Sequence, residues 1–105
     1  MANMPATLTL KEVQQFIEAT CKERGWDKRP VADKMLLMTE EVGEVAKALR
    51  KELQMGAEKP ENTDHLGEEL VDVLNYVADL ATTFDIDLEL AFRNKWAKNA
   101  TRTWA

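Results

Sequence analysis

The chain has 105 residues, of which 45% are hydrophobic, and it carries a formal net charge of −5. This is the size of one small domain, so we expect residues 1–105 to form a single domain, with residues 1–7 flexible. The acidic charge argues against a nucleic-acid binder and a membrane-surface binder, because both need a basic face. An acidic protein that handles phosphates would need a metal ion to do so.

Targeting and redox features of the sequence are few. No apolar run approaches the roughly 18 residues that a membrane span requires, and the first residues lack the basic-then-apolar pattern of a signal peptide. The single cysteine, Cys21, excludes an internal disulfide framework and falls on the apolar side of the first expected helix. We therefore expect a cytoplasmic protein with a buried free thiol.

The first half of the chain predicts two helices. Thr9 and Glu12 form a capping box ahead of apolar residues at helical spacing, and Gly25 ends this helix. Pro30 can open a second, longer helix that stops near Gly56. Both helices are amphipathic, so each should turn one apolar stripe towards a core.

The second half of the chain predicts two more helices. Residues 56–64 are polar and form a loop, with Thr63 or Asp64 as the N-cap of the third helix. After a short link at residues 84–86, Asp87 is expected to cap the fourth helix. No stretch alternates as a β-strand does, so we expect an all-α, four-helix bundle.

Two acid pairs stand inside the apolar runs of the second and third helices. Glu41 and Glu44 are three residues apart, as are Glu69 and Asp72, so each pair shares one helix face. The apolar helical neighbours of Glu41 and Glu69 are Leu37, Met38, Val45, Leu66 and Val73. An ionised carboxylate beside a core is costly unless it is paired or binds a metal. Two such pairs on neighbouring helices would converge into a magnesium site.

An ordinary charged helix surface is the alternative interpretation of these acids. It suits Glu52 and Asp79, and Glu44 could pair with Lys47 at the surface. It suits Glu41 and Glu69 poorly, because their helical neighbours are apolar.

The fourth helix changes character along one face. Its stripe begins with Leu88, Ala91 and Phe92. It continues by helical spacing with Lys95, Asn99 and Arg102, which suit phosphate oxygens. Taken alone, the strip could equally be a basic C-terminal turn favoured by the helix dipole. Together with the acid pairs, it indicates a nucleotide or another polyphosphate ligand.

With these acid pairs and this basic strip, the sequence resembles the MazG-like, all-α nucleoside triphosphate pyrophosphohydrolases. The resemblance covers roughly residues 8 to 104, and the joint acid motif is specific although either half alone is weak. The segments that carry it are Glu23-Arg24-Gly25-Trp26, Glu40-Glu41-Val42-Gly43-Glu44, Glu68-Glu69-Leu70-Val71-Asp72 and Lys95 to Arg102.

The resemblance implies an enzyme dependent on Mg²⁺, with Mn²⁺ as a substitute ion. It would cleave an NTP or dNTP between the α and β phosphates, giving the monophosphate and pyrophosphate in nucleotide-pool house-cleaning. It implies metal ligation by Glu41, Glu44, Glu69 and Asp72. It also points to a homodimer or homotetramer, which the short amphipathic helices favour independently.

Further residues receive roles by the same resemblance. Lys95 and Arg102 would steady the pyrophosphate, with Asn99 beside them. Glu40 would bind a second Mg²⁺ or orient the attacking water, unless it is a solvated acid. Trp26 would help to enclose the base, with structural packing as an equally good alternative.

The residues after Asp72 are candidates for the sugar or for support of the metal ligands. Asn75 and Tyr76 lie one helical turn beyond Asp72, where either could support a metal ligand. The Tyr76 hydroxyl could instead line the sugar pocket. His65, the only histidine, is expected at the surface near a helix start.

Two rival functions remain to be weighed. A di-iron carboxylate bundle is disfavoured because its Glu-x-x-His motifs are missing, and ligation by oxygen alone suits Mg²⁺ or Mn²⁺. A catalytically silent dimerisation or adaptor module would explain the amphipathic helices, but not the acids that border the core.

Overall fold

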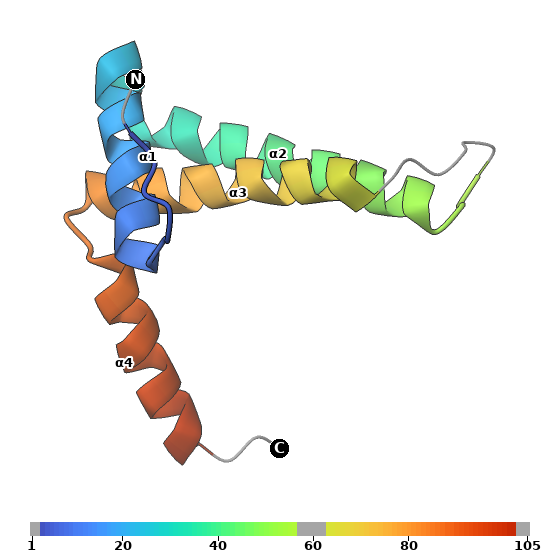
Figure 1. The fold of residues 1–105 in the computed structure, drawn as a ribbon. Helices are drawn as coiled ribbons and strands as arrows, with labels where there is room; N and C mark the ends of the chain where they lie inside the picture. The colour runs from blue at the N-terminus through green and yellow to red at the C-terminus, as the bar shows by residue number, and fades with distance from the viewer. Residues whose placement is uncertain (1–2, 57–62, 103–105) are drawn as a thin grey trace. The chain divides into compact units, whose positions relative to one another are not determined.

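The computed structural model describes residues 3–56 and 63–102. Its elements are α1 (Leu10–Arg24), the short 3₁₀ helix η1 (Trp26–Lys28), α2 (Val31–Glu52), α3 (Thr63–Thr83) and α4 (Leu88–Thr101) (Figure 1). No strand occurs in these residues, which confirms the predicted all-α class with four helices. None of the described helices is long and apolar enough to cross a bilayer.

The ends of α1 follow the predicted capping chemistry. Thr9 Oγ1 accepts a hydrogen bond from the Glu12 N–H at 3.1 Å, and the Thr9 N–H donates to the Glu12 carboxylate at 3.0 Å. Gly25 closes the helix at a φ of 74°, a left-handed conformation that favours glycine. The predicted capping box and glycine stop are both confirmed.

The ends of α2 and α3 differ slightly from prediction. Pro30 is the N-cap of α2 rather than its first helical residue, and the helix ends at Glu52, with Leu53 as its C-cap. The expected cap at Thr63 or Asp64 is wrong, because α3 already includes both residues. Most of the predicted loop, residues 57–62, lies outside the described residues.

Two compact units divide the chain. Residues 1–28 and 78–105 make up one, here called the terminal unit, and residues 29–77 make up the other, the hairpin unit. The terminal unit contains α1, η1, the end of α3 and α4. It buries Cys21, Ala78 and Ala81, so the predicted buried free thiol is confirmed.

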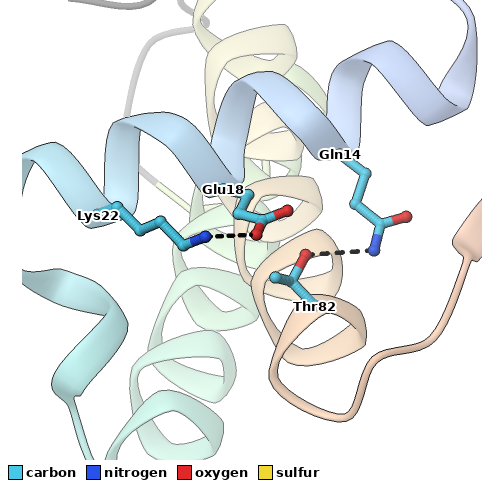
Figure 2. A network of polar contacts seen from close by, with 4 residues as sticks. All are labelled: Gln14, Glu18, Lys22 and Thr82. Atoms are coloured by element: carbon cyan, nitrogen blue, oxygen red, sulfur yellow. Dashed lines mark hydrogen bonds and ion pairs between the residues drawn. The ribbon is translucent and has the colours of Figure 1, made fainter.

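Polar contacts connect α1 to the end of α3 inside the terminal unit. Figure 2 shows Gln14 Nε2 donating to Thr82 Oγ1 at 3.2 Å. The same view shows Lys22 Nζ bonded to the Glu18 carboxylate at 2.8 Å, one turn away on α1. The predicted cap of α4 is confirmed, since Asp87 Oδ1 accepts from the Leu90 N–H at 3.0 Å.

The hairpin unit consists of α2 and most of α3, which run antiparallel beside each other (Figure 1). Its predicted apolar stripes do not face a closed core, because Val42 is 49% exposed and Leu70 is 52% exposed. The stripes line an open groove of about 400 Å³ instead. The lining residues are Val42, Val45, Leu70, Val73, Leu74 and Val77. Two helices alone have too few partners to cover one another's apolar faces.

Two buried charges depart from the sequence prediction. The prediction of a solvated surface for Asp79 on α3 is wrong, because Asp79 is only 9% exposed. Lys34 on α2 is only 1% exposed. Neither residue lacks an interaction partner, as buried charges require.

The apolar start of the α4 stripe is also more open than predicted. Phe92 is 57% exposed, and it contacts Trp96, the rings being 6.3 Å apart between centroids. Leu88 and Ala91 are half-buried, so the apolar start of the stripe becomes open to solvent only at Phe92.

Candidate metal centre

Three carboxylates from two helices meet in the hairpin unit. Glu41 on α2 and Glu69 and Asp72 on α3 each offer an oxygen, and these oxygens all lie within 4.8 Å of one another. The i,i+3 spacing of Glu69 and Asp72 places both on one face of α3, and the antiparallel neighbour α2 brings Glu41 to them. We call Glu41, Glu69 and Asp72 the carboxylate cluster. It contains three of the four predicted metal ligands.

The electrostatics of the cluster are unfavourable for three negative charges. Burial raises the pKa of the Glu41 carboxyl, and the negative charges of Asp72 and Glu69 raise it further. Glu69 is itself well shielded, since only 14% of its side chain is exposed. Repelling carboxylates held half-buried gain stability when a cation neutralises them. The donor set is all oxygen, which suits a hard divalent ion such as Mg²⁺ or Mn²⁺.

The two remaining acids of α2 border the cluster without joining it. Glu44 lies one turn beyond Glu41 and is exposed, and Glu40 is exposed as well. Both carboxylates contribute to the raised pKa of Glu41, after burial, Asp72 and Glu69. Their charges therefore act on the cluster, although their oxygens are not part of it.

His65 is a neighbour of the cluster that sequence reasoning placed at the surface. Its Nε2 lies 3.5 Å from Glu69 Oε1, and its Nδ1 lies 3.9 Å from Glu68 Oε2. An imidazole beside a ligating carboxylate can fix the orientation of that carboxylate. The signal was present in the i,i+4 spacing of His65 and Glu69, which puts both on one face of α3.

Asn75 and Tyr76 follow the cluster on α3. Both are half-buried and lie one turn C-terminal to Asp72, in the position predicted for residues that line a ligand site. Because they share α3 with Glu69 and Asp72, one rigid helix positions all four side chains.

The predicted phosphate-binding strip lies on α4, in the terminal unit. Lys95 is exposed, and Asn99 is half-buried, with an Oδ1 atom that is shielded from solvent and finds no hydrogen-bond partner among the described residues. Arg102 differs from the prediction. It follows the last residue of α4 in an extended conformation, so helical spacing does not place it in line with Lys95 and Asn99. Its N–H still donates to the Asn99 carbonyl at 3.2 Å.

Trp26 lies in η1, also in the terminal unit. The residue is 37% exposed, and the Arg24 guanidinium carbon lies 4.9 Å from the centroid of its ring. The cation contributes a favourable cation–π contact on the ring. If Trp26 stacks on a base as predicted, the base can contact only the part of the ring that Arg24 does not cover.

Comparison with known proteins identifies a family and a similar solved structure. The sequence profile of the family described as the MazG nucleotide pyrophosphohydrolase domain matches residues 30–104. The crystal structure of YPJD from Bacillus subtilis, described as a candidate pyrophosphatase, is 26% identical to this chain, with a TM-score of 0.78. That alignment covers 94% of this chain and 100% of YPJD. No curated protein matches the sequence.

Proposed function

Because the chain belongs to the MazG nucleotide pyrophosphohydrolase family, we propose that it cleaves a nucleoside or deoxynucleoside triphosphate between the α and β phosphates. The products are the nucleoside monophosphate and pyrophosphate. The observation that supports this most directly is the carboxylate cluster, whose oxygens from α2 and α3 lie within 4.8 Å of one another. Such a cluster suits a hydrolase that must neutralise a polyanion before attacking it.

The acids of the chain have two roles in the proposed reaction, which are metal binding and acceptance of a proton. Glu41, Glu69 and Asp72, with Glu44 at the edge, hold Mg²⁺ or Mn²⁺ in this proposal. When bound, the ion supplies charge neutralisation for the phosphate oxygens and acidifies water. Glu40 accepts the proton of the attacking water, whose oxygen forms a new bond to the α phosphorus. The bond from that phosphorus to the bridging oxygen breaks, and pyrophosphate leaves with the electron pair.

The remaining contacts orient the substrate. Lys95, Asn99 and Arg102 hold the distal phosphates, because ammonium and guanidinium groups donate charge-assisted hydrogen bonds to phosphate oxygens. Trp26 contacts the base, and Asn75 and Tyr76 line the side of the sugar. We place the enzyme in the cytoplasm, where it removes unwanted nucleotides from the pool.

A second copy of the chain completes the fold in this proposal. The groove lined by Val42 and Leu74 carries six apolar residues and leaves much of their surface in water. The apolar positions 35, 38, 42, 45 and 49 of α2 repeat every three and four residues, as do 66, 70, 73, 77 and 80 of α3. This heptad spacing is typical of helices that pack as a four-helix bundle. Two hairpin units related by a two-fold axis would form such a bundle, giving a homodimer, and pairs of dimers would give a homotetramer.

Identification of the products tests the proposed reaction. The protein is incubated with Mg²⁺ and each canonical triphosphate, and the products are separated by ion-exchange chromatography. Monophosphate and intact pyrophosphate are expected in equal amounts, with no early orthophosphate. Diphosphate and orthophosphate as primary products would contradict the assignment. No turnover of any nucleotide would favour the silent dimerisation module.

A further inference from the structure

The side chain of Gln14 on α1 makes three hydrogen bonds to the link between α3 and α4. Its Nε2 donates to Thr82 Oγ1 at 3.2 Å and to the Ile86 carbonyl at 2.7 Å. Its Oε1 accepts from the Leu88 N–H at 2.9 Å. All these groups belong to the terminal unit, and Figure 2 shows the contact with Thr82. A primary amide has two donors and one acceptor oxygen, and all three functions are used here.

These bonds fix the place where α4 begins. Leu88 is the first residue of α4, so its N–H has no partner within the helix. Asp87 accepts a hydrogen bond from the Leu90 N–H, and Gln14 accepts one from the Leu88 N–H. Two N–H groups in the first turn of α4 are thus satisfied by side chains from different segments of the chain. The other two bonds of Gln14 go to Thr82 at the end of α3 and to Ile86 within the link. Asp85, between them, has a φ of 54°, an unfavourable conformation for a residue other than glycine.

The contact between α1 and α4 is reciprocal. Glu89 in the first turn of α4 accepts from the Lys11 N–H in the first turn of α1, at 3.4 Å. Gln14 of α1 in turn caps the first residue of α4. Each helix thus supplies a side chain to the N-terminal turn of the other. The direction of α4 therefore depends on contacts with Lys11 and Gln14, in the first two turns of α1.

We infer that Gln14 is a positioning residue for the phosphate-binding residues of α4. The inference rests on the proposed function, in which Lys95 contacts the distal phosphates. Lys95 lies seven residues after Leu88, about 10 Å along the helix axis. A change of about 10° in the direction of α4 would therefore move the Lys95 backbone by about 2 Å. Displacements of this size are large compared with the tolerance of a charge-assisted hydrogen bond.

The test replaces Gln14 and measures phosphate binding separately from folding. Gln14→Met keeps the length of the side chain and removes all three hydrogen bonds. The matched control is Gln15→Met on the exposed neighbouring position. We expect Gln14→Met to raise the KM for triphosphate about tenfold and to weaken calorimetric binding of pyrophosphate in the presence of Mg²⁺ to a similar degree. Mg²⁺ binding and the Gln15→Met control should stay unchanged.

A second variant covers the case in which Gln14→Met fails to fold. Gln14→Glu keeps the acceptor for Leu88 but loses both amide donors, and it sets a carboxylate against the Ile86 carbonyl. It should show a smaller rise in KM of the same kind. A fall in thermal stability with unchanged KM and unchanged pyrophosphate affinity would overturn the inference in either variant.

Lys95→Ala, measured in parallel, distinguishes a failure of the positioning role of Gln14 from a failure of the phosphate-binding role of α4. If Lys95→Ala raises the KM and the Gln14 variants do not, the positioning role of Gln14 is wrong and the phosphate contact stands. If Lys95→Ala changes neither KM nor pyrophosphate affinity, the phosphate-binding role of α4 is wrong, and the inference about Gln14 falls with it.

Discussion

The two units of this chain stabilise themselves by different means. The terminal unit joins its segments with hydrogen bonds, since Gln14 and Glu89 connect α1 to the α3–α4 link and to α4. The hairpin unit has an apolar groove lined by residues of α2 and α3, and it also contains the three acids of the carboxylate cluster. In the first unit, the Gln14 amide and the N–H groups of Leu88 and Leu90 are all paired within one chain. The second holds unfavourable charge and uncovered apolar surface, both of which call for a further partner.

This difference indicates where the described residues most need a further ligand or partner, which is the hairpin unit. Uncovered apolar side chains gain stability by burial against another apolar surface. Repelling carboxylates gain stability from a cation. The hairpin unit has both uncovered apolar side chains and repelling carboxylates. Variants of these residues test whether a second copy of the chain and a metal ion stabilise them.

The largest effect is expected at the carboxylate cluster. Glu41→Gln, Glu69→Gln and Asp72→Asn should each lower kcat/KM by about 10³-fold, because each removes several kcal/mol of charge stabilisation at the metal. Glu44→Gln should cost less, about tenfold to a hundredfold, since Glu44 lies outside the cluster. Steady-state kinetics at saturating Mg²⁺ would measure this, with circular dichroism as the check of folding.

The control for these variants must be an exposed acid. Asp79 is unsuitable because it is buried, whereas Asp64 in the first turn of α3 is exposed. Asp64→Asn should keep near-normal activity. Near-normal activity in two or more of the cluster variants would contradict metal ligation by the cluster.

The next effect concerns the groove. Val42→Lys should raise the dissociation constant of the oligomer by about 100-fold or more, because an unpaired charge inside an apolar interface costs several kcal/mol. Leu36→Lys is the matched control, since Leu36 is exposed on α2 but does not line the groove. Analytical ultracentrifugation would compare the two variants. A compact monomer of the unmodified protein at micromolar concentration would exclude the proposed bundle.

A smaller effect on activity is expected from changes in the predicted phosphate-binding strip of the terminal unit. Lys95→Ala and Arg102→Ala should each raise the KM for triphosphate about tenfold to a hundredfold, because a hydrogen bond to a charged group contributes about 1.5–3 kcal/mol. Calorimetric Mg²⁺ affinity should not change, since these side chains contact the substrate rather than the ion. Equal losses of Mg²⁺ and substrate binding would show that the variants disturb the fold instead.

The smallest effect is on the stability of the metal-free protein. The raised pKa of Glu41 means that the folded state disfavours its ionised form. Stability from this group is therefore lost as the pH rises from its ordinary pKa near 4.5 to the raised value. Glu41→Gln should remove this loss and melt at a higher temperature than the parent protein at pH 7 without metal. Mg²⁺ should reverse the order, and thermal denaturation with EDTA and with Mg²⁺ would show both results.

Local chemistry made much of the fold predictable. Thr9, Gly25 and Asp87 define helix ends through contacts with their own neighbours in sequence, so their roles follow from three or four residues of context. The convergence of Glu41 with Glu69 and Asp72 also followed from helical spacing, given two adjacent helices. Arg102 shows the limit of this reasoning, because helical spacing fails where the helix ends.

The missed features depend on contacts between distant segments. Asp79 follows the pattern of a surface acid in sequence, but it is buried together with Ala78 and Ala81 in the part of α3 that belongs to the terminal unit. Gln14 lies among other polar residues on α1, and its three partners are 68 to 74 residues away. A helical wheel describes one helix at a time, so it cannot show which polar residue will bond to another segment.

That same separation along the chain has a consequence for the order of folding. The hairpin unit is contiguous, residues 29–77, so it can form as soon as that segment leaves the ribosome. The terminal unit needs Gln14 and Lys11 to meet residues 82 to 89, which closes loops of 68 to 78 residues. Contacts so distant in sequence form late and slowly. A nascent chain that stops before α4 would therefore leave Lys11 and Gln14 without the hydrogen bonds that they make to Glu89 and Leu88.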